Sequence, residues 1–586
     1  MVALGLLGRS GTIAASIMRA LVLGVAIVAD AAWYDGIKSV QVFTPADDVG
    51  TAAWNLYSRM KTAQFSSERH ALLLTSGDYQ GAEIAVGYYT SLIGVGQDPD
   101  AVTVASFYTL DNPDVGNACV NFWRSAEGLR ASNPNITWAA SQAAPLRRVH
   151  VDHDLWLSER GPPHWSSGGF MSASTIQGPL HMGTQQQYLV RNSLLQQGAV
   201  GKAMNYVYVG VDGAPANSSD GRVSTLARTP LIAEKPYLVE ANGQWSICLP
   251  HLLHDVAGVG KTTVCATQID VDADVFVAKE GDSAATINAA IAGKRALLLT
   301  PALYDLDGPI IIGDPDFVVL GIGFPTLLAT SGRSALVVNT SATNARVAGV
   351  LLEAATDVSA APTDPLMLWA GDGGVGSDLF ARVGALKYST PQKPSCLKTR
   401  ADTHLRVEGS SVVLDNTWFW HADHDDCGGA SDQAYSAHGL EVMGDDVTAY
   451  GLKSEHTFED LVSWKGERGR TFMFQSELPY NDLRFGGFGY HVVQSVREHQ
   501  ALGMGVYIIG ELTVKAGIQL PLGSTAANLF SWVIGRSVKQ FASVVCVGTG
   551  SKQTCYGGDT CDYSSCYQLG LPPPAGRTTI LQLNLT

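Results

Sequence analysis

One phrase of the sequence occurs twice: RHALLLTSGDYQ at Arg69–Gln80 returns in looser form as KRALLLTPALYD at Lys294–Asp305. Before each copy stand a short apolar run, an acidic turn and an amphipathic segment, and after each copy comes an apolar run that ends in Gly-x-Gly. The four segments keep the same order and nearly the same spacing in both places. Such a repeat indicates a duplicated structural unit, so the chain is expected to contain two related domains.

The segments that follow each copy predict short strands. Brief β-branched or aromatic runs, such as Ala345–Ala354 and Leu440–His456, are broken by Gly, Asp or Asn. Strand groups recur about every 20 to 30 residues, as in the coils of a solenoid. The amphipathic segment before each LLLT run is expected to be a helix that caps the first coil. We therefore predict an all-β fold of two tandem right-handed parallel β-helices, each with an N-terminal capping helix. Two β-sandwiches are the alternative, but they would not open with a helix.

The same pattern gives the domain boundaries. Arg9 and Arg19 precede the apolar run Ala20–Ala29, which is too short for a comfortable membrane span and leads into a small-x-small cleavage site. We predict a secretion signal here; a buried first helix is the alternative. The predicted segments are a signal peptide at 1–31, a first β-helix at 38–228, a linker at 229–269, a second β-helix at 270–540 and a Cys-rich tail at 541–586.

The nine cysteines fit an exported protein. Four of them lie in the tail, where we expect two disulfides whose pairing the sequence leaves open. Cys248 and Cys265 flank the linker, Cys396 and Cys427 could meet across neighbouring turns, and Cys119 is left over. A zinc site in the tail is the alternative, but the tail has neither a histidine nor a CxxC pair. The tail cysteines are Cys546, Cys555, Cys561 and Cys566, and glycosylation sequons for a eukaryotic secretory route start at Asn135, Asn217, Asn339 and Asn584.

Charge and composition exclude several classes of function. The formal net charge is −15 and no run of Lys and Arg occurs, so a nucleic-acid partner is not expected. No later segment reaches about 18 apolar residues, so no membrane-spanning helix is expected either. The segment AGVGKTT at Ala257–Thr263 resembles a phosphate loop, but Asp255 stands where the loop needs its first glycine. A Ser-His-Asp hydrolase and a CxxC redox protein also lack their motifs.

Several segments together resemble a known family. The opening INAAIAGKRALLLTPALYDLDGPI is similar to the first coil of pectate-lyase-like β-helix proteins. From Val40 to Gln540, segments including SSGGF, HADHDD, GDDVTAYGLKSEH and GRTFMFQSELPY resemble, in the same order, secreted proteins that often carry the labels "adenylyl cyclase" or "coagulation factor 5/8 type". The sequence shows no nucleotide-cyclase pattern of metal-binding aspartates. The two-solenoid layout also resembles the tandem β-helix β-1,3-glucanases (laminarinases), which implies a pectate-lyase-like fold and action on a polysaccharide.

The richest polar patch is WFWHADHDDCGG at Trp418–Gly429. Equivalent positions on successive coils stack about 5 Å apart, which brings carboxylates to the separations that glycosidases use. Tryptophan rings beside them are suited to stacking on sugars. We therefore predict a secreted, monomeric glycoside hydrolase that cleaves a polysaccharide, most simply a β-glucan. The predicted catalytic residues are Asp423, Asp425, Asp426 and Glu455, and the predicted substrate-binding residues are Trp418, Trp420, His421, His456, Arg470 and Glu477.

Two other functions stay open at this point. A polysaccharide lyase would use a base such as Lys453, Lys465 or Arg470, with calcium held by the aspartates of the patch to neutralise a uronate. A non-catalytic solenoid that binds a cell-wall glycan is the third function. Asp445 and Asp446 stand in a G-D-D turn, where aspartate more often shapes the turn than acts in catalysis. No cofactor is expected for the hydrolase.

Overall fold

The structure is a computed structural model, and it describes residues 32–161, 164–201, 204–386, 396–425, 427–428, 433–480, 484–509, 512, 514–534, 541–556 and 579–584. Residues from Ile37 onward form one unit of the chain. Most of its regular structure is β, and the strands of the large sheets pair mostly in parallel. Among the residues that the structure describes, none of the helices has the length and hydrophobicity needed to cross a bilayer.

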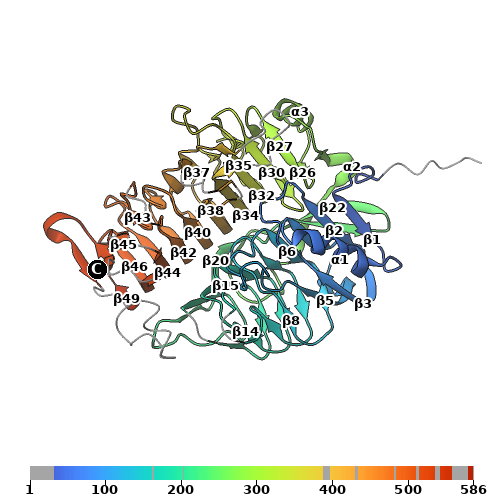
Figure 1. The fold of residues 1–586 in the computed structure, drawn as a ribbon, viewed down its shortest axis with the longest axis horizontal. Helices are drawn as coiled ribbons and strands as arrows, with labels where there is room; N and C mark the ends of the chain where they lie inside the picture. Colours follow the sequence, from blue (N-terminus) through green and yellow to red (C-terminus); the bar gives the residue numbers. More distant parts are fainter. Residues whose placement is uncertain are drawn as a thin grey trace, which may run out of the picture. The chain divides into compact units, whose positions relative to one another are not determined.

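The first half of the chain winds repeatedly through three parallel sheets, which we call the first stack (Figure 1). Helix α1 (Val49–Met60) and the short 3-10 helix η1 (Pro99–Ala101) accompany its first coils. Its nine-stranded sheet has the order β1 (Val40–Phe43), β2 (His70–Leu74), β4 (Thr90–Gly94), β6 (Arg124–Glu127), β9 (Leu146–Arg147), β12 (Gly169–Ser172), β15 (Gln187–Arg191), β18 (Asn205–Val209) and β19 (Val223–Leu226). Its six-stranded sheet has the order β16 (Leu194–Leu195), β13 (Thr175–Ile176), β10 (His150–Val151), β7 (Arg130–Ala131), β5 (Val102–Tyr108) and β3 (Gly77–Ala85). Its four-stranded sheet has the order β17 (Ala199–Val200), β14 (Leu180–His181), β11 (Leu155–Trp156) and β8 (Ile136–Thr137).

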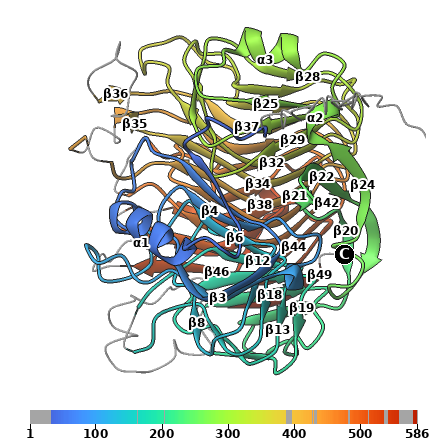
Figure 2. The ribbon, with the colours of Figure 1, turned by 90° about the vertical axis from the view of Figure 1, so that its right-hand side faces the viewer.

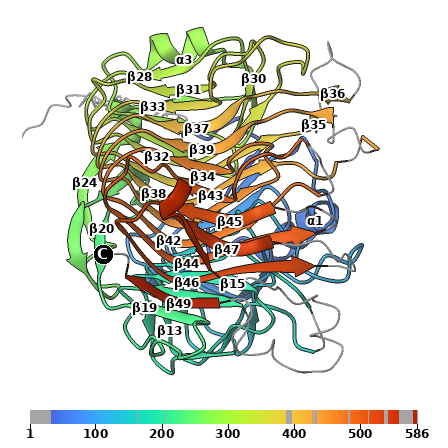
Figure 3. The same ribbon diagram turned by 90° about the vertical axis from the view of Figure 1, so that its left-hand side faces the viewer.

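The second half forms a similar coiled set, the second stack, which begins near helices α2 (Val271–Asp274) and α3 (Ala284–Ala290). The main path of its thirteen-stranded sheet runs β25 (Val275–Ala278), β26 (Ala296–Leu299), β29 (Val318–Gly321), β32 (Arg346–Ala354), β34 (Val375–Val383), β38 (Val413–His421), β40 (Thr448–Glu455), β42 (Gly469–Glu477), β44 (His499–Ile509), β46 (Ser524–Ile534) and β49 (Thr579–Asn584). The strands β27 (Leu303–Leu306) and β30 (Thr326–Ala329) complete the sheet off this path. The ten-stranded sheet, which Figure 3 faces, runs β28 (Ile310–Ile312), β31 (Leu336–Val338), β33 (Met367–Trp369), β37 (Thr403–Val407), β39 (His438–Val442), β41 (Val462–Trp464), β43 (Tyr490–Val492), β45 (Val514–Leu520), β47 (Phe541–Val547) and β48 (Thr554–Tyr556). The short pair β35 (Ala385–Leu386) and β36 (Leu397–Lys398) is antiparallel.

Antiparallel strands connect the two stacks along the chain. They form a pair, β20 (Thr229–Ile232) with β23 (Leu253–Val256), and a three-stranded sheet of β21 (Tyr237–Ala241), β22 (Gln244–Pro250) and β24 (Cys265–Asp270). A disulfide between Cys248 and Cys265 ties β22 to β24.

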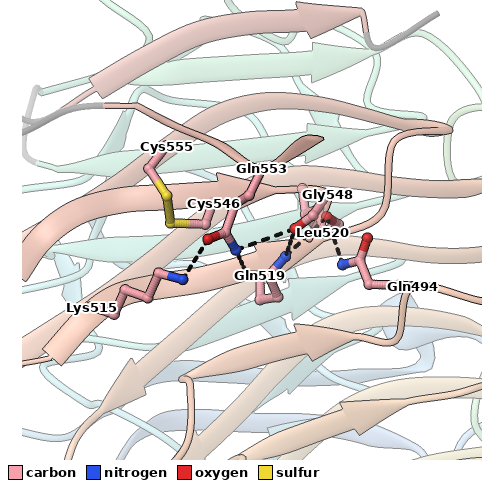
Figure 4. Close-up of a disulfide and its surroundings, with 8 residues drawn as sticks. All are labelled: Gln494, Lys515, Gln519, Leu520, Cys546, Gly548, Gln553 and Cys555. Carbon is pink, nitrogen blue, oxygen red and sulfur yellow. Dashed lines mark hydrogen bonds between the residues drawn. A yellow bond between two sulfur atoms is a disulfide. The ribbon is translucent and has the colours of Figure 1, made fainter. Parts of the chain in front are cut away.

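The other disulfides also follow the sequence expectation. Cys396 bonds to Cys427, and Cys546 bonds to Cys555 across the antiparallel strands β47 and β48, near the 3-10 helix η3 (Gly550–Lys552) (Figure 4). The prediction of disulfides is thus confirmed for these cysteines. Cys561 and Cys566, the other two tail cysteines, lie outside the described residues.

The duplicated phrase has a structural explanation. In β2 the alternating Leu72 and Leu74 enter the core of the first stack, and the same positions of β26 enter the core of the second. The threonine and tyrosine close the end of the preceding strand: the hydroxyl groups of Thr75 and Tyr79 both donate to the carbonyl oxygen of Phe43, at 3.1 and 2.6 Å. In the second copy, Thr300 and Tyr304 donate in the same way to Ala278, at 2.8 and 3.0 Å. The phrase is therefore an element of stability, since it fills the core and satisfies a strand-end carbonyl.

The first glycine of each Gly-x-Gly run allows two coils to approach closely. A Cβ atom on Gly94 would collide with the carbonyl oxygen of Gly128, and one on Gly321 would collide with the carbonyl oxygen of Gly349. No side chain fits at either position, which explains why both copies keep the residue.

The two stacks lie side by side (Figure 2), and buried apolar side chains from both pack together. Apolar residues of the second stack, including Phe380, join the hydrophobic cluster of the first. Beside them lies a buried ionic network: Arg147 donates to Asp378 at 2.9 Å, and to Asp415 at 2.8 Å. Arg191 also binds Asp415, and both arginines bind Glu234. Buried charges need such complete pairing, so the network favours one relative placement of the two stacks.

Candidate active site

Two glutamates end neighbouring strands of the thirteen-stranded sheet. Glu455 is the last residue of β40 and Glu477 is the last residue of β42. The strands pair in parallel with Lys453 opposite Gln475, and the backbone N–H of His456 donates to the carbonyl oxygen of Glu477 at 2.9 Å. The register therefore places the two carboxyl groups on adjacent coils, whose strands lie about 4.8 Å apart.

Both carboxyl oxygens of Glu455 accept hydrogen bonds, and the residue is buried. The side-chain amide of Gln142 donates to its Oε1 at 2.9 Å, and the indole N–H of Trp418 donates to its Oε2 at 2.9 Å. Only 4% of Glu455 is exposed. Gln142 belongs to the first stack, so the site is built where the two stacks meet.

Glu477 is the member of the pair that opens to solvent, with 21% of its side chain exposed. The hydroxyl of Tyr480 donates to its Oε2, and His456 Nε2 lies 3.8 Å from the same oxygen. The two glutamates thus differ in exposure: Glu477 is partly open to solvent, whereas Glu455 is covered.

Both carboxyl groups titrate at unusually high pH. Burial first, and then the charge of Glu477, raise the pKa of Glu455 well above its ordinary value. Burial also raises the pKa of Glu477 to about 7, against the hydrogen bond from Tyr480, which lowers it. Because the charge of Glu477 raises the pKa of Glu455, the pair loses its two protons in separate steps. One of them can then donate a proton while the other is ionised.

Asp423 adds a third carboxylate beside the pair. Its Oδ1 accepts from the indole N–H of Trp420 at 3.2 Å and from His424 Nδ1 at 3.1 Å. Burial alone would raise the pKa of Asp423, but the hydrogen bond from His424 holds it below its ordinary value. Its negative charge in turn raises the pKa of both glutamates. His456 is buried, which lowers its pKa to about 4 and keeps the ring neutral near pH 7.

The two tryptophans lie at the site but not as sugar platforms. The rings of Trp418 and Trp420 stack on each other at 5.1 Å, pack on Phe122 and Trp123 of the first stack, and are each 1% exposed. We expected their faces to meet a sugar. The structure instead covers the faces, and the indole N–H groups orient Glu455 and Asp423.

Two of the predicted binding residues lie away from the pair. Arg470 is near the start of β42, opposite Thr448, seven positions before Glu477 and therefore roughly 20 Å away along the strand. His421 is buried, with Nδ1 hydrogen-bonded to Ser436 at 2.9 Å and its ring against Phe458. Arg470 lies away because a strand separates the residues at its two ends. His421 stands at the same strand end as Glu455, directly after Trp420, but its side chain is turned to Ser436 and Phe458.

The predicted catalytic aspartates do not all lie at the glutamate pair. Asp423 is at the site, whereas Asp425 accepts the backbone N–H of Cys427 at 2.6 Å and shapes the turn that the Cys396–Cys427 disulfide closes. Asp426 lies outside the described residues.

Three polar residues of the site were not among the predicted ones: Gln142, His424 and Tyr480. His424 stands within the HADHDD segment and contacts Gln64 of the first stack at 2.7 Å, so its pattern was visible but its role was not. Gln142 is separated from Glu455 by 313 residues, and no local pattern marks it.

A comparison with known proteins identifies the family. Over 515 residues, the chain is 33% identical to an exo-β-1,3-glucanase of Streptomyces sp. (strain SirexAA-E / ActE). The match covers 83% of this chain and 82% of the relative. This chain belongs to the Lam55 exo-β-1,3-glucanase family. It is accordingly an enzyme of the glycoside hydrolase class.

Further comparisons agree with the Lam55 assignment. Residues 275–477 match the family model described as the LAM55 pectate lyase-like domain. The solved structure of sacteLam55A from Streptomyces sp. SirexAA-E has a TM-score of 0.81 and 29% identity, covering 93% of this chain and 98% of that one. A variant of sacteLam55A with one glutamate replaced by alanine, in complex with glucose, has a TM-score of 0.79 and 28% identity, with the same coverage. The resemblance to laminarinases is thus confirmed, and neither relative is described as an adenylyl cyclase or a coagulation factor.

Proposed function

We propose that this Lam55 family member hydrolyses β-1,3-linked glucan from a chain end. The observation that carries the proposal is the buried pair Glu455 and Glu477, of which one member is open to solvent and one is covered. The family relative is an exo-β-1,3-glucanase, and a related structure binds glucose, which supports the choice of substrate.

The neighbours of the two glutamates support distinct roles. Glu477, which is partly exposed and has a pKa raised to about 7, donates its proton to the oxygen of the leaving sugar. Glu455 accepts hydrogen bonds on both oxygens, from Gln142 and Trp418, so it is poorly placed to attack a sugar carbon itself. In the proposed reaction it accepts a proton from the attacking water, which inverts the configuration at the anomeric carbon.

Two variants test these roles. Glu477→Gln is expected to lose activity on laminarin by about 100-fold or more, but much less on a glucosyl fluoride, because fluoride leaves without a proton. Glu455→Gln is expected to lose activity on both. Glu459→Gln, which changes an exposed carboxyl group, is the matched control and should retain activity. Equal losses on both substrates for Glu477→Gln would contradict its role as the acid.

The lyase alternative has no structural support. Lys453 is fully buried and donates to Asn416 at 2.5 Å, and Lys465 lies 3.5 Å from Glu441 on the other sheet. Incubation with neutral and uronate polysaccharides separates the functions: new reducing ends from laminarin support the hydrolase, and absorbance of unsaturated products from a uronate polymer would overturn it.

We also propose that the protein is exported and that it consists of two tandem β-helices. The three disulfides support an oxidising destination, and the sheet topology supports two tandem right-handed β-helices with boundaries near those predicted. N-terminal sequencing of protein recovered from the medium should begin after Ala31. A mature chain that starts at Met1 would contradict the secretion signal.

A further inference from the structure

Three metal-ligating side chains gather on the first stack, outside the glutamate pair. Asp111 follows β5, and Glu159 and His164 follow β11. Each offers one ligand atom, and these atoms all lie within 4.8 Å of one another. The group therefore joins two coils of the first stack through residues of the kinds that bind metal ions.

The Asp111 carboxyl group is incompletely satisfied. Its side chain is 9% exposed, and its Oδ2 accepts from His164 Nδ1 at 2.5 Å. Its Oδ1 is buried and has no hydrogen-bond partner. Glu159 brings a second carboxylate to the same place, since its Oε1 accepts the backbone N–H of Asp111 at 2.8 Å. A buried carboxylate oxygen without a partner costs free energy, and a second negative charge nearby increases the cost.

In the described residues, no lysine or arginine offsets these charges. Within the described part of the chain, neither Asp111 nor Glu159 forms an ion pair with lysine or arginine. A second histidine of the same stack shows the contrast. His150 lies 2.5 Å from Asp100 and 3.5 Å from Asp152, and there Arg130 contacts both carboxylates, at 4.0 and 3.0 Å.

We propose that Asp111, Glu159 and His164 bind a divalent transition-metal ion of the zinc class. One imidazole and two carboxylates are a ligand set that Zn²⁺ accepts, with water completing the coordination. Two carboxylates and a neutral imidazole balance the charge of such an ion. His164 is 26% exposed, which gives the ion access from solvent.

The position of the site gives the ion a structural role. The segment after Asp111 leads to Phe122, whose ring lies 4.6 Å from that of Trp418 in the active site. A metal that ties this segment to the coil after β11 stabilises one wall of the junction between the stacks. The ion takes no part in the hydrolysis.

Metal titration of the full-length protein tests the proposal. After treatment with EDTA and dialysis, Zn²⁺ is added and Tm is measured, with Ca²⁺ in a parallel sample. Zn²⁺ is expected to raise Tm by several degrees and to bind at one ion per chain by calorimetry, whereas Ca²⁺ has little effect. Co²⁺ at the same site should give visible absorption bands of a low-coordinate ion.

Variants identify the ligands. Asp111→Asn and His164→Ala should each lose the Zn²⁺-dependent rise in Tm and the one-to-one binding. Asp111→Asn should also be at least as stable as the unmodified protein without metal, because it removes a buried negative charge beside Glu159, so misfolding would be recognised. His150→Ala is the matched control and should keep the response. No Zn²⁺ effect on the unmodified protein, or an undiminished effect in Asp111→Asn, overturns the proposal.

Discussion

At the scale of single residues, the two glutamates differ through the groups that touch them. Tyr480 donates to Glu477 at the open side of the site, and Gln142 donates to Glu455 at the covered side. Each hydrogen bond stabilises an ionised carboxyl group and so lowers its pKa. The acidity of the pair is therefore adjustable at each glutamate separately.

Tyr480→Phe should shift the limb of the activity profile that reports Glu477. In the proposed reaction Glu477 acts in its protonated form, and its pKa of about 7 includes a lowering by the Tyr480 hydrogen bond, so its protonated fraction falls as pH rises through that value. Loss of the hydroxyl raises this pKa, and the limb of kcat/KM should move up by about one pH unit. The phenyl ring keeps the contact with His456 at 4.4 Å. An unchanged limb would show that another group controls it.

Gln142→Leu should act on the limb that reports Glu455 instead. Without the amide donor, the pKa of Glu455 rises further, so this carboxyl group ionises at a higher pH and its limb of kcat/KM moves up by about one unit. Gln177→Leu removes a similar amide, bonded to His150 elsewhere on the first stack, and should leave the profile unchanged. If both variants behave alike, the assignment of Gln142 is wrong.

At this scale the sequence singled out some of the residues that the structure brings together. Asp423, Glu455, His456 and Glu477 could be proposed because polar residues gather in consecutive strands, and their roles stay a prediction. The roles of the tryptophans were not predictable, since sequence does not show which ring faces are covered. Gln142 was not found because its partner lies 313 residues away and one glutamine carries no pattern.

At the scale of elements, the repeated motifs explain the start of each stack. The LLLT strands and the helices before them were predictable because their patterns are local. The lengths of the sheets were not, because strands of two or three residues leave no periodicity to detect.

Gly321→Ala tests the close approach of β29 and β32. The added Cβ meets the Gly349 carbonyl oxygen, and since backbone must move, the free energy of unfolding should fall by about 1–3 kcal/mol or more. Gly313→Ala, where a Cβ meets nothing within 4 Å, is the control. Chemical denaturation measures both. Equal stability of the two variants would remove packing as the reason for the glycine.

His404 in β37 should make the second stack sensitive to acid. Its ring nitrogens are buried without hydrogen-bond partners, and burial lowers its pKa to about 3. The unfolded chain binds a proton near pH 6.5 and the folded chain does not, so stability falls as pH drops from about 6.5 toward 3. In His404→Leu, denaturation midpoints should fall less steeply over this range. An unchanged slope would assign the sensitivity to other buried histidines, such as His499.

At the scale of the whole molecule, the two stacks depend on a shared buried network. The duplication predicted two similar units, but nothing local predicted how they meet, because the ion pairs that join one stack to the other, such as Arg147 with Asp378, connect residues more than 200 positions apart. The contact between the two stacks therefore depends on residues that only folding brings together, and no single segment of the sequence predicts it.

Arg147→Met should lower the stability that the buried network between the two stacks provides. It leaves three buried carboxylates with fewer partners, so the free energy of unfolding is expected to fall by about 3–5 kcal/mol. Arg130→Met breaks a more exposed pair with Asp152 and should cost about 1 kcal/mol or less. Urea unfolding followed by fluorescence, together with activity at each urea concentration, measures both effects. Similar losses for the two variants would contradict the role of the network.

The hydrogen bond from Gln142 to Glu455 also bears on how such an enzyme can change over time. The proposed proton-transferring pair lies in the second stack, and Gln142, which donates to one member of the pair, lies in the first. If the proposal holds, substitutions in the first stack can adapt the enzyme to a more acidic or more alkaline habitat while both carboxyl groups stay as they are. One stack could then vary in sequence to tune a reaction whose carboxyl groups lie in the other.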